Sequence, residues 1–199
     1  MGGTRYGPSD TEETGESPVN LDLEKVYVVL AEDNPFMRSL IRTVLRVLGC
    51  DHVAEAANGI EVLRLLKAGQ NPDIIITNWE MPKLDGITLI RMIRDPNESP
   101  NPYVPIIMVS AYSEEHRVIQ ARDAGVSEFL AKPISAQLLY ERIVTTIEHP
   151  RPFVKSEGFF GPDRRHRQDP LYAGTERRKA HAEEGAPNGE AAAEPGTRG

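Results

Sequence analysis

Five polar side chains that directly follow strand-like apolar segments could together bind a cation and an oxyanion. They are Glu32 and Asp33 after the first segment, Asn78 after the third, Ser110 after the fourth and Lys132 after the fifth. Carboxylate oxygens are ligands that Mg²⁺ prefers, whereas a lysine and a hydroxyl can contact phosphoryl oxygens. Functional groups in an open parallel sheet gather beyond the carboxyl ends of the strands, so we expect these side chains to share one rim.

The elements that must position these side chains alternate along the chain. The expected strands, of which the second is the least regular, span 26–30, 52–56, 74–77, 106–109 and 128–130. The expected helices run from 35 to 48, onward from 59, from about 87 to 94, and onward from 113 and from 135. This alternation predicts an α/β fold in which a five-stranded parallel sheet carries helices on both faces, a (βα)5 arrangement.

The first helix has recognisable ends and an apolar repeat. Asn34 can cap its start with Pro35 at the first position, and Gly49 stops it. The apolar residues that repeat at helical spacing between these ends are Phe36, Leu40, Ile41, Val44, Leu45 and Leu48. The pattern predicts a helix that begins directly after the acidic pair.

Composition is that of a protein with one core of moderate size. Of the 199 residues, 39% are hydrophobic and 27% are charged, and the formal net charge of −7 argues against nucleic-acid affinity of the whole protein. We expect a cytoplasmic protein without membrane contact, because the sequence has neither a secretory signal nor a membrane-spanning segment. Composition also predicts a disordered segment over 1–22, one folded domain over 23–149, and a largely disordered tail over 150–199.

Four stretches of the sequence resemble the receiver domain of the bacterial response-regulator family. They are "VVLAEDN" with the acidic pair, "PDIIITNWEMPKLDG" with its Met-Pro and Asp-Gly, "VPIIMVSAY" with the hydroxyl, and "EFLAKPIS" with its Lys-Pro. The resemblance covers about residues 24–148. It implies a flavodoxin-like, CheY-like receiver fold and a place in two-component (phosphorelay) signal transduction.

The resemblance also assigns roles to individual residues. Glu32, Asp33 and the main chain of Glu80 would hold Mg²⁺, and Ser110 and Lys132 would contact the phosphoryl group. Ser110 and the aromatic Phe129 would form the conformational switch, and the peptide bond between Lys132 and Pro133 would be cis.

Asn78 departs from the family pattern. In response regulators this position holds the aspartate that takes the phosphoryl group from a phosphohistidine. A neutral carboxamide is a far poorer nucleophile than a carboxylate, so ordinary phosphotransfer should fail. The rim also loses one of three acids, so we expect Mg²⁺ to bind weakly.

Three interpretations of this amide are open. The chain is a natural pseudo-receiver that acts as a protein-binding module, because fold and function can separate. Alternatively, it is an ordinary phosphorylated regulator in which asparagine has been engineered in place of the acceptor aspartate. A third interpretation, slow deamidation of Asn78 to the acid, is disfavoured because the bulky Trp79 hinders attack by the backbone and a buried strand end is rigid.

The effect of the protein must pass to a partner. Only about fifty residues follow Glu148, so we expect neither an enzyme nor an attached output domain. In this family the fourth helix, fifth strand and fifth helix usually meet the target; here that face includes Glu115, Arg122, Gln137 and Tyr140. A sensor histidine kinase is a further candidate partner.

The segment 151–180 is basic, with eight Lys or Arg against four Asp or Glu. One interpretation is a flexible tail without which the domain still folds. In a second, Arg164, Arg165 and Arg167 bind a phosphate-bearing ligand such as a cyclic dinucleotide or RNA, since arginine forks suit phosphate. Packing of the phenylalanines at 153, 159 and 160 on the domain would instead make the segment a structural arm.

Overall fold

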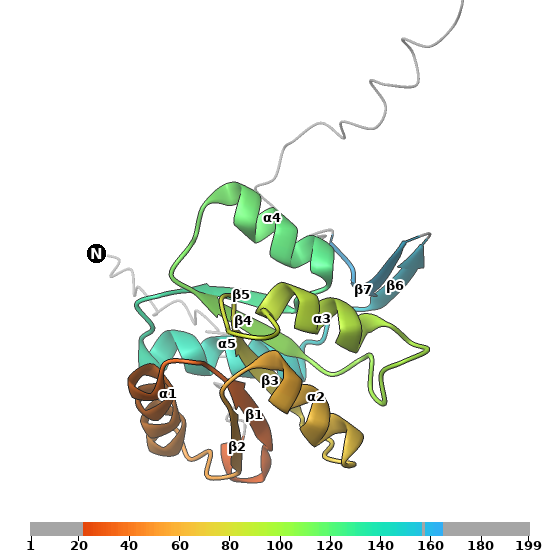
Figure 1. The fold of residues 1–199 in the computed structure, drawn as a ribbon. Coiled ribbons are helices and arrows are strands. Elements are labelled where there is room, and N and C mark those ends of the chain that lie inside the picture. Colours follow the sequence, from red (N-terminus) through yellow and green to blue (C-terminus); the bar gives the residue numbers. More distant parts are fainter. Residues whose placement is uncertain (1–21, 157, 165–199) are drawn as a thin grey trace, which may run out of the picture. The chain divides into compact units, whose positions relative to one another are not determined.

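The computed structural model describes residues 22–156 and 158–164, and these contain the expected parallel sheet in the order β2-β1-β3-β4-β5 (Figure 1). The strands are β1 (Val28–Ala31), β2 (Val53–Ala56), β3 (Ile74–Asn78), β4 (Ile106–Ser110) and β5 (Glu128–Ala131). The helices are η1 (Leu23–Lys25), α1 (Pro35–Val47), α2 (Gly59–Lys67), α3 (Gly86–Arg94), α4 (Glu115–Ala124) and α5 (Ala136–Glu148). All five predicted strands are confirmed, with boundaries that differ by one or two residues. Within the described ranges no helix is long and apolar enough to cross a bilayer.

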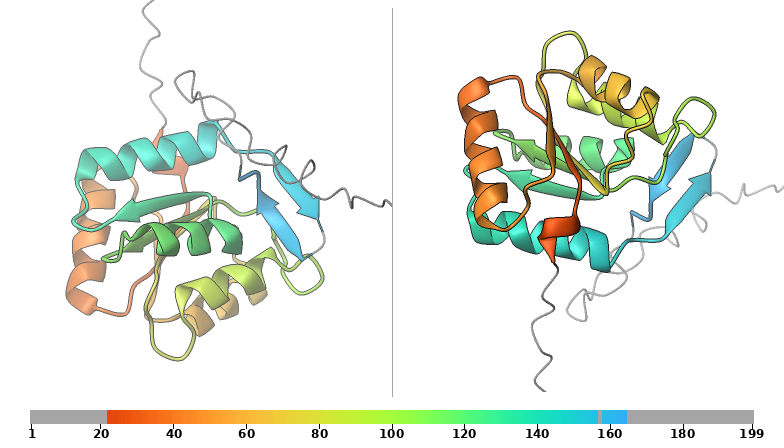
Figure 2. Two further views of the ribbon diagram at one scale, coloured as in Figure 1. Left: turned by 90° about the horizontal axis from the view of Figure 1, so that it is seen from above. Right: turned by 90° about the horizontal axis from the view of Figure 1, so that it is seen from below.

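Helices cover both faces of the sheet. α1 and α5 pack on one face, and α2, α3 and α4 pack on the other (Figure 2). Alternate strand residues supply the two cores, since Val28 and Leu30 pack with α1 and α5 whereas Val29 and Ala31 pack on the opposite face. This flavodoxin-like fold brings the carboxyl ends of β1, β3, β4 and β5 to one edge of the sheet.

The helix α1 begins as the sequence predicts. The side-chain oxygen of Asn34 accepts a hydrogen bond from the main-chain N–H of Phe36 at 3.0 Å, and Ile41 and Leu45 are buried against the sheet. The apolar repeat nevertheless includes positions that face solvent, because Phe36 is 84% exposed and Leu40 is 56% exposed. The helix therefore has a second, uncovered apolar surface next to the acidic pair.

The chain after α5 forms a hairpin in place of the expected disordered tail. Strands β6 (Phe153–Ser156) and β7 (Phe159–Pro162) pair antiparallel beside the loop that follows α3 (Figure 2). These two strands lie within the segment for which the sequence predicted a largely disordered tail, and residues 157 and 165–199 lie outside the described part of the chain. The sequence did not predict these strands, because their phenylalanines stand among polar residues and do not form an apolar run of strand length.

An aromatic cluster holds this hairpin on the domain. The rings of Phe153 and Phe160 lie 5.1 and 5.2 Å from the ring of Tyr103, in the loop after α3. The buried guanidinium of Arg94 lies 5.1 Å from the ring of Phe153 and donates hydrogen bonds to the carbonyls of Pro102, Val104 and Gly125. Burial lowers the pKa of Arg94 to about 9, so the side chain is still cationic at neutral pH. These contacts make the hairpin an arm of the folded domain, and whether the domain folds without it stays a prediction.

Phe160→Ala should lower the free energy of unfolding by about 2 kcal/mol, because it removes a half-buried ring from the cluster with Tyr103 and Phe153. Urea unfolding followed by the emission of Trp79, the single tryptophan, measures the loss. Val154→Ala is the matched control, since this side chain of the same hairpin is 36% exposed and should cost less than about 0.5 kcal/mol. Equally small effects of both substitutions would contradict the stabilising role of the hairpin.

Candidate functional site

The strand ends bring the five predicted polar residues to one edge of the sheet, which we call the rim: Glu32, Asp33, Asn78, Ser110 and Lys132. Asn78 and Ser110 are the last residues of β3 and β4, and the others follow β1 and β5. Glu32 and Ser110 are buried, with 2% and 0% of their surfaces exposed, whereas Asp33 is exposed. The rim therefore combines a charged group inside the fold with one that faces solvent.

The side-chain amide of Asn78 connects the acidic residues of the rim. Its nitrogen, Nδ2, lies 3.2 Å from a carboxylate oxygen of Glu32, 3.2 Å from one of Asp33 and 2.9 Å from the main-chain carbonyl of Glu80. An amide nitrogen carries two hydrogens, so three acceptors share two donors. These three acceptors are the groups that the family resemblance assigned to Mg²⁺.

The orientation of this amide follows from its neighbours. The amide oxygen of Asn78 accepts a hydrogen bond from the main-chain N–H of Trp79 at 2.8 Å. The opposite orientation would place the amide oxygen against three acceptors and the amide nitrogen against the N–H of Trp79, so that none of these four contacts would be a hydrogen bond. Hydrogen bonding thus determines which side of the amide faces Glu32 and Asp33.

The other predicted rim residues also have partners. The ammonium group of Lys132 lies 2.8 Å from the second carboxylate oxygen of Glu32 and forms an ion pair with it. The hydroxyl oxygen of Ser110 accepts a hydrogen bond from the main-chain N–H of Tyr112 at 3.0 Å. The peptide bond between Lys132 and Pro133 is cis, as the resemblance implied. Phe129 is half-buried in the core that α2, α3 and α4 cover, and its switch role stays a prediction.

A tight turn carries the chain from the rim into α3. Asp85 caps this helix by accepting a hydrogen bond from the N–H of Thr88 at 3.0 Å, and the N–H of Gly86 donates to the carbonyl of Trp79 at 2.8 Å. A Cβ atom added at Gly86 would overlap the carbonyl oxygen of Asn78. The Asp-Gly pair therefore lets the start of α3 approach the backbone of the rim.

The rim offers oxygen ligands that suit Mg²⁺ in chemical type, namely two carboxylates and one carbonyl. Within the described residues, however, no group of three His, Cys, Asp or Glu side chains could hold a metal ion. The nitrogen of Asn78 already faces Glu32, Asp33 and the carbonyl of Glu80. A cation would therefore have to displace these hydrogen bonds before it could use the same oxygens.

The predicted anion-binding arginines are described only in part. Arg164 follows β7, where it forms an ion pair with Asp123 at 3.1 Å and lies 3.7 Å from the ring of Phe159. Its charge is thus already paired with a carboxylate. Arg165 and Arg167 lie outside the described residues, so the anion-binding hypothesis stays a prediction.

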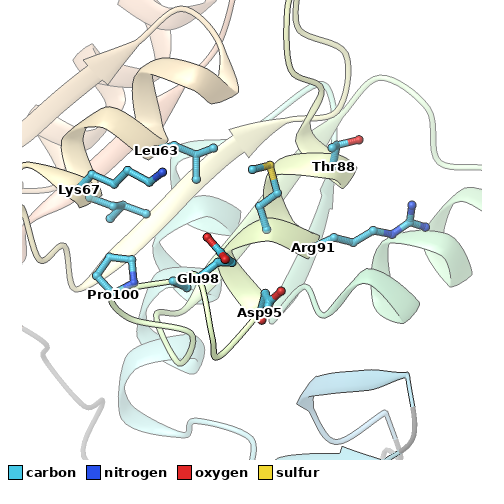
Figure 3. Close-up of a pocket in the computed structure, with 10 residues that line it drawn as sticks. Leu63, Lys67, Thr88, Arg91, Asp95, Glu98 and Pro100 are labelled. Atoms are coloured by element: carbon cyan, nitrogen blue, oxygen red, sulfur yellow. The ribbon is translucent and has the colours of Figure 1, made fainter.

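A separate cavity of about 390 Å³ lies between α2 and α3, away from the rim (Figure 3). Leu63, Leu66 and Met92 give it an apolar wall, and Lys67, Arg91, Asp95 and Glu98 add charges of both signs. None of the five rim residues lines it. The cavity therefore has no share in the predicted chemistry.

Sequence reasoning missed the residues that surround Glu80. The guanidinium of Arg117 in α4 lies 5.1 Å from the ring of Trp79 and 4.3 Å from the ring of Tyr112. A lone arginine on a helix gives no sequence signal of such contacts, because they depend on how the helix lies against another loop. Trp79 directly follows Asn78 and Tyr112 lies two residues after Ser110, and this closeness to rim positions is the one hint that the sequence contains.

Comparisons with known proteins point to receiver domains. The family described as "Response regulator receiver domain" matches residues 28–144. The chain is 36% identical to the chemotaxis protein CheY of Pseudomonas aeruginosa over 121 residues, which cover 61% of this chain and 95% of that protein. It is 33% identical to the chemotaxis protein CheY-3 of Vibrio cholerae over 120 residues, which cover 60% and 90%.

Solved structures agree with these sequence relatives. The receiver domain of a sensor histidine kinase from Pseudomonas aeruginosa, solved with a magnesium ion in its active-site cleft, has a TM-score of 0.56 and 31% identity. That likeness covers 62% of this chain and 98% of that one. A putative response regulator from Chloroflexus aurantiacus has a TM-score of 0.57 at 28% identity, covering 62% and 98%. The β6-β7 hairpin lies beyond the residues that the family matches.

Gly86→Ala should destabilise the domain by about 2 kcal/mol, because the added methyl group overlaps the carbonyl oxygen of Asn78. Thermal unfolding measures this loss, and near-ultraviolet circular dichroism of Trp79 should change if the rim backbone moves. Gly69→Ala is the control. No atom lies near an added Cβ at Gly69, but its φ is +86°, so this variant measures only the conformational cost of a side chain in the left-handed region, about 1 kcal/mol. A Gly86→Ala protein as stable as the parent would contradict the close approach.

Proposed function

The chain belongs to the response regulator receiver domain family, and on that premise we propose that it is a signalling adaptor that works without phosphorylation of its own rim. In this proposal Asn78 occupies the phosphoacceptor position. The protein then transmits a signal by binding other proteins and not by carrying a phosphoryl group. Receiver domains as a class interact with histidine kinases and other proteins, so a protein partner is the expected target.

The observation that carries this proposal is the position of the Asn78 amide. Its nitrogen donates hydrogen bonds to Glu32, Asp33 and the carbonyl of Glu80. Hydrogen bonds from a donor to a carboxylate are each worth about 1.5–3 kcal/mol in proteins. These internal contacts stabilise the rim without a bound cation. Residue 78 at the same time supplies no nucleophilic carboxylate.

Phosphoryl transfer needs an attacking oxygen that becomes the acyl phosphate. A carboxylate supplies this oxygen with a negative charge, whereas a carboxamide would have to lose its resonance. The oxygen of Asn78 is moreover held by the N–H of Trp79 at 2.8 Å. Ser110 and Lys132 lie at the neighbouring strand ends, where this proposal gives them contact with the phosphoryl group, so the group that the proposal regards as missing is the nucleophile.

A bound Mg²⁺ would supply positive charge that stabilises a transferring phosphoryl group. In this chain Glu32, Asp33 and the carbonyl of Glu80 would hold it. We propose that such binding is weak, because the amide brings no charge and its hydrogen bonds compete for the same oxygens. The ion pair between Lys132 and Glu32 further lowers the negative charge that a cation would meet.

Exposed apolar side chains support a protein partner. On α4, Val118 and Ile119 are 36% and 39% exposed, and this helix belongs to the α4-β5-α5 face that the family resemblance assigns to a target. On α1, Phe36, Leu40 and Val47 are 84%, 56% and 77% exposed. Their spacing puts them on one side of the helix, separate from the side that carries the buried residues. The segment after β1 leads from Glu32 and Asp33 into α1, and the loop after β4 leads from Ser110 into α4. A partner bound to either helix would therefore contact a part of the chain that is continuous with the rim.

Asn78→Asp should convert an inert protein into one that accepts a phosphoryl group from acetyl phosphate. The substituted carboxylate supplies the one missing group, beside Glu32, Asp33 and Lys132. Both proteins would be incubated with acetyl phosphate and Mg²⁺ and then examined by intact-mass spectrometry. The parent should gain no mass, whereas the variant should gain one phosphoryl group that is lost in base, as acyl phosphates are.

Asn78→Asp with Lys132→Ala is the control, because loss of the ammonium group should greatly reduce the adduct. Phosphorylation of the parent within residues 28–144 would refute the inert rim. An Asn78→Asp protein that stays unmodified would show that more than the nucleophile has been lost.

Mg²⁺ should bind the parent at least about tenfold more weakly than it binds the Asn78→Asp protein, since the variant adds a formal negative charge to the ligand set. Trp79, next to residue 78 and the single tryptophan, reports binding through its fluorescence in a Mg²⁺ titration. An Asp33→Asn substitution in each background should weaken binding further. Equal affinity of parent and variant would contradict the competition between amide and cation.

A further inference from the structure

The N-terminal half of α4 has few contacts that could fix its position. Within residues 115–120 Arg117 alone is half-buried, and the other five are exposed. The buried residues of this helix, Ala121 and Ala124, lie in its second half. Glu114 at the N-cap makes no capping hydrogen bond with its side chain among the described residues, although most helices gain stability from such a cap. A helix start with so little packing should separate from the domain at low cost in free energy.

Arg117 supplies the contacts that this helix start otherwise lacks. Its guanidinium is 4.3 Å from the ring of Tyr112 and 5.1 Å from the ring of Trp79, and it lies 3.8 Å from a carboxylate oxygen of Glu80. The hydroxyl of Tyr112 lies 3.4 Å from the other oxygen of the same carboxylate. Trp79 is almost fully buried, so it provides a rigid surface for the cation.

The same contacts lead back to Asn78. The carbonyl of Glu80 accepts a hydrogen bond from the Asn78 nitrogen at 2.9 Å, while the side chain of Glu80 pairs with Arg117. On the other side, the N–H of Tyr112 donates to the hydroxyl of Ser110 at 3.0 Å. A continuous set of contacts therefore joins two rim residues to the start of α4 through one glutamate and two aromatic rings.

We propose that Arg117 is a latch that fixes the start of α4 against the rim, so that the chemical state of residue 78 determines how firmly α4 is held. With asparagine, the donor at residue 78 fixes the backbone of Glu80, and the carboxylate of Glu80 is positioned for Arg117. A carboxylate at residue 78 would repel the carbonyl of Glu80 and weaken the latch. The biological use of this latch rests on the proposed function, because α4 is part of the proposed partner-binding face.

The latch also explains how the adaptor presents one surface without phosphorylation. Arginine is suited to the role because its flat guanidinium can stack on an aromatic ring and still pair with a carboxylate. Lysine has no flat face and would keep only part of these contacts. Arg117 is a positioning residue here, since it acts through Glu80 and the rings and not on any reacting atom.

Hydrogen exchange of the main-chain amides in residues 115–124 tests the latch. Arg117→Met should make the first turns of α4 exchange about tenfold faster, because the cation–π contacts and the ion pair are lost together. Arg117→Lys should give an intermediate rate. Arg122→Met is the matched control on the same helix, since Arg122 pairs only with its neighbour Asp123, at 3.6 Å, among the contacts described; its effect on these turns should be less than about twofold.

Emission of Trp79 provides a second, independent readout. Acrylamide should quench this tryptophan more strongly in Arg117→Met than in the parent, because the ring loses the group that covers it. Unchanged exchange in α4 together with unchanged quenching would overturn the latch. These readouts need no phosphoryl donor, so their failure is distinguishable from a failure of the proposed inert rim.

A double substitution tests the coupling to residue 78. Without Mg²⁺, Asn78→Asp should also speed exchange at the start of α4, by about threefold or more. In the Arg117→Met background the same substitution should add little, because the latch that transmits its effect is already gone. Equal effects of Asn78→Asp in both backgrounds would show that residue 78 and α4 are not coupled through Arg117.

Discussion

The hydrogen bonds from the Asn78 amide to Glu32, Asp33 and the carbonyl of Glu80 are the contacts on which the arrangement of the rim depends. These three oxygen-bearing groups meet where the strands end, and their oxygen atoms repel one another unless a cation or a donor lies between them. The amide nitrogen supplies two hydrogens at this point, and Lys132 supplies a positive charge on the far side of Glu32. A carboxylate that is almost fully buried can therefore stay in place at low cost in free energy.

The rest of the domain holds that contact in position from two directions. Parallel pairing of β1 with β3 brings Glu32 and Asp33 beside Asn78, and the turn at Gly86 lets α3 begin close to the same backbone. The β6-β7 hairpin packs elsewhere, on the loop after α3, through Phe153, Phe160 and Tyr103. The domain thus has one polar cluster, on which the proposed function rests, and a separate aromatic cluster whose contacts hold the hairpin. Substitutions in the hairpin should accordingly change stability without changing which groups meet at the rim.

The sequence predicted those parts of the structure that local patterns determine. Strands such as Ile74–Asn78 are continuous apolar runs, Asn34 with Pro35 is a strong helix start, and the order of polar residues at strand ends indicated the rim. The hairpin was missed because Phe153 and Phe160 gain their burial from Tyr103 and Arg94, which lie far away in sequence. The direction of the Asn78 amide and the contacts of Arg117 were likewise beyond prediction, since they depend on the relative placement of elements. Phe36 and Leu40 match a helical repeat, yet nothing local shows that they face solvent.

The side-chain amide resonances of Asn78 in a ¹⁵N-correlated NMR spectrum test the central contact most directly. They are identified as the pair that Asn78→Gln removes, and their rate of exchange with water is then measured without Mg²⁺ and with millimolar Mg²⁺. Hydrogen bonds to Glu32, Asp33 and Glu80 predict slow exchange of both protons, with little change when the metal is added. Fast exchange without metal, as for an asparagine in solvent, would contradict the account, because the amide would then not join the acids of the rim.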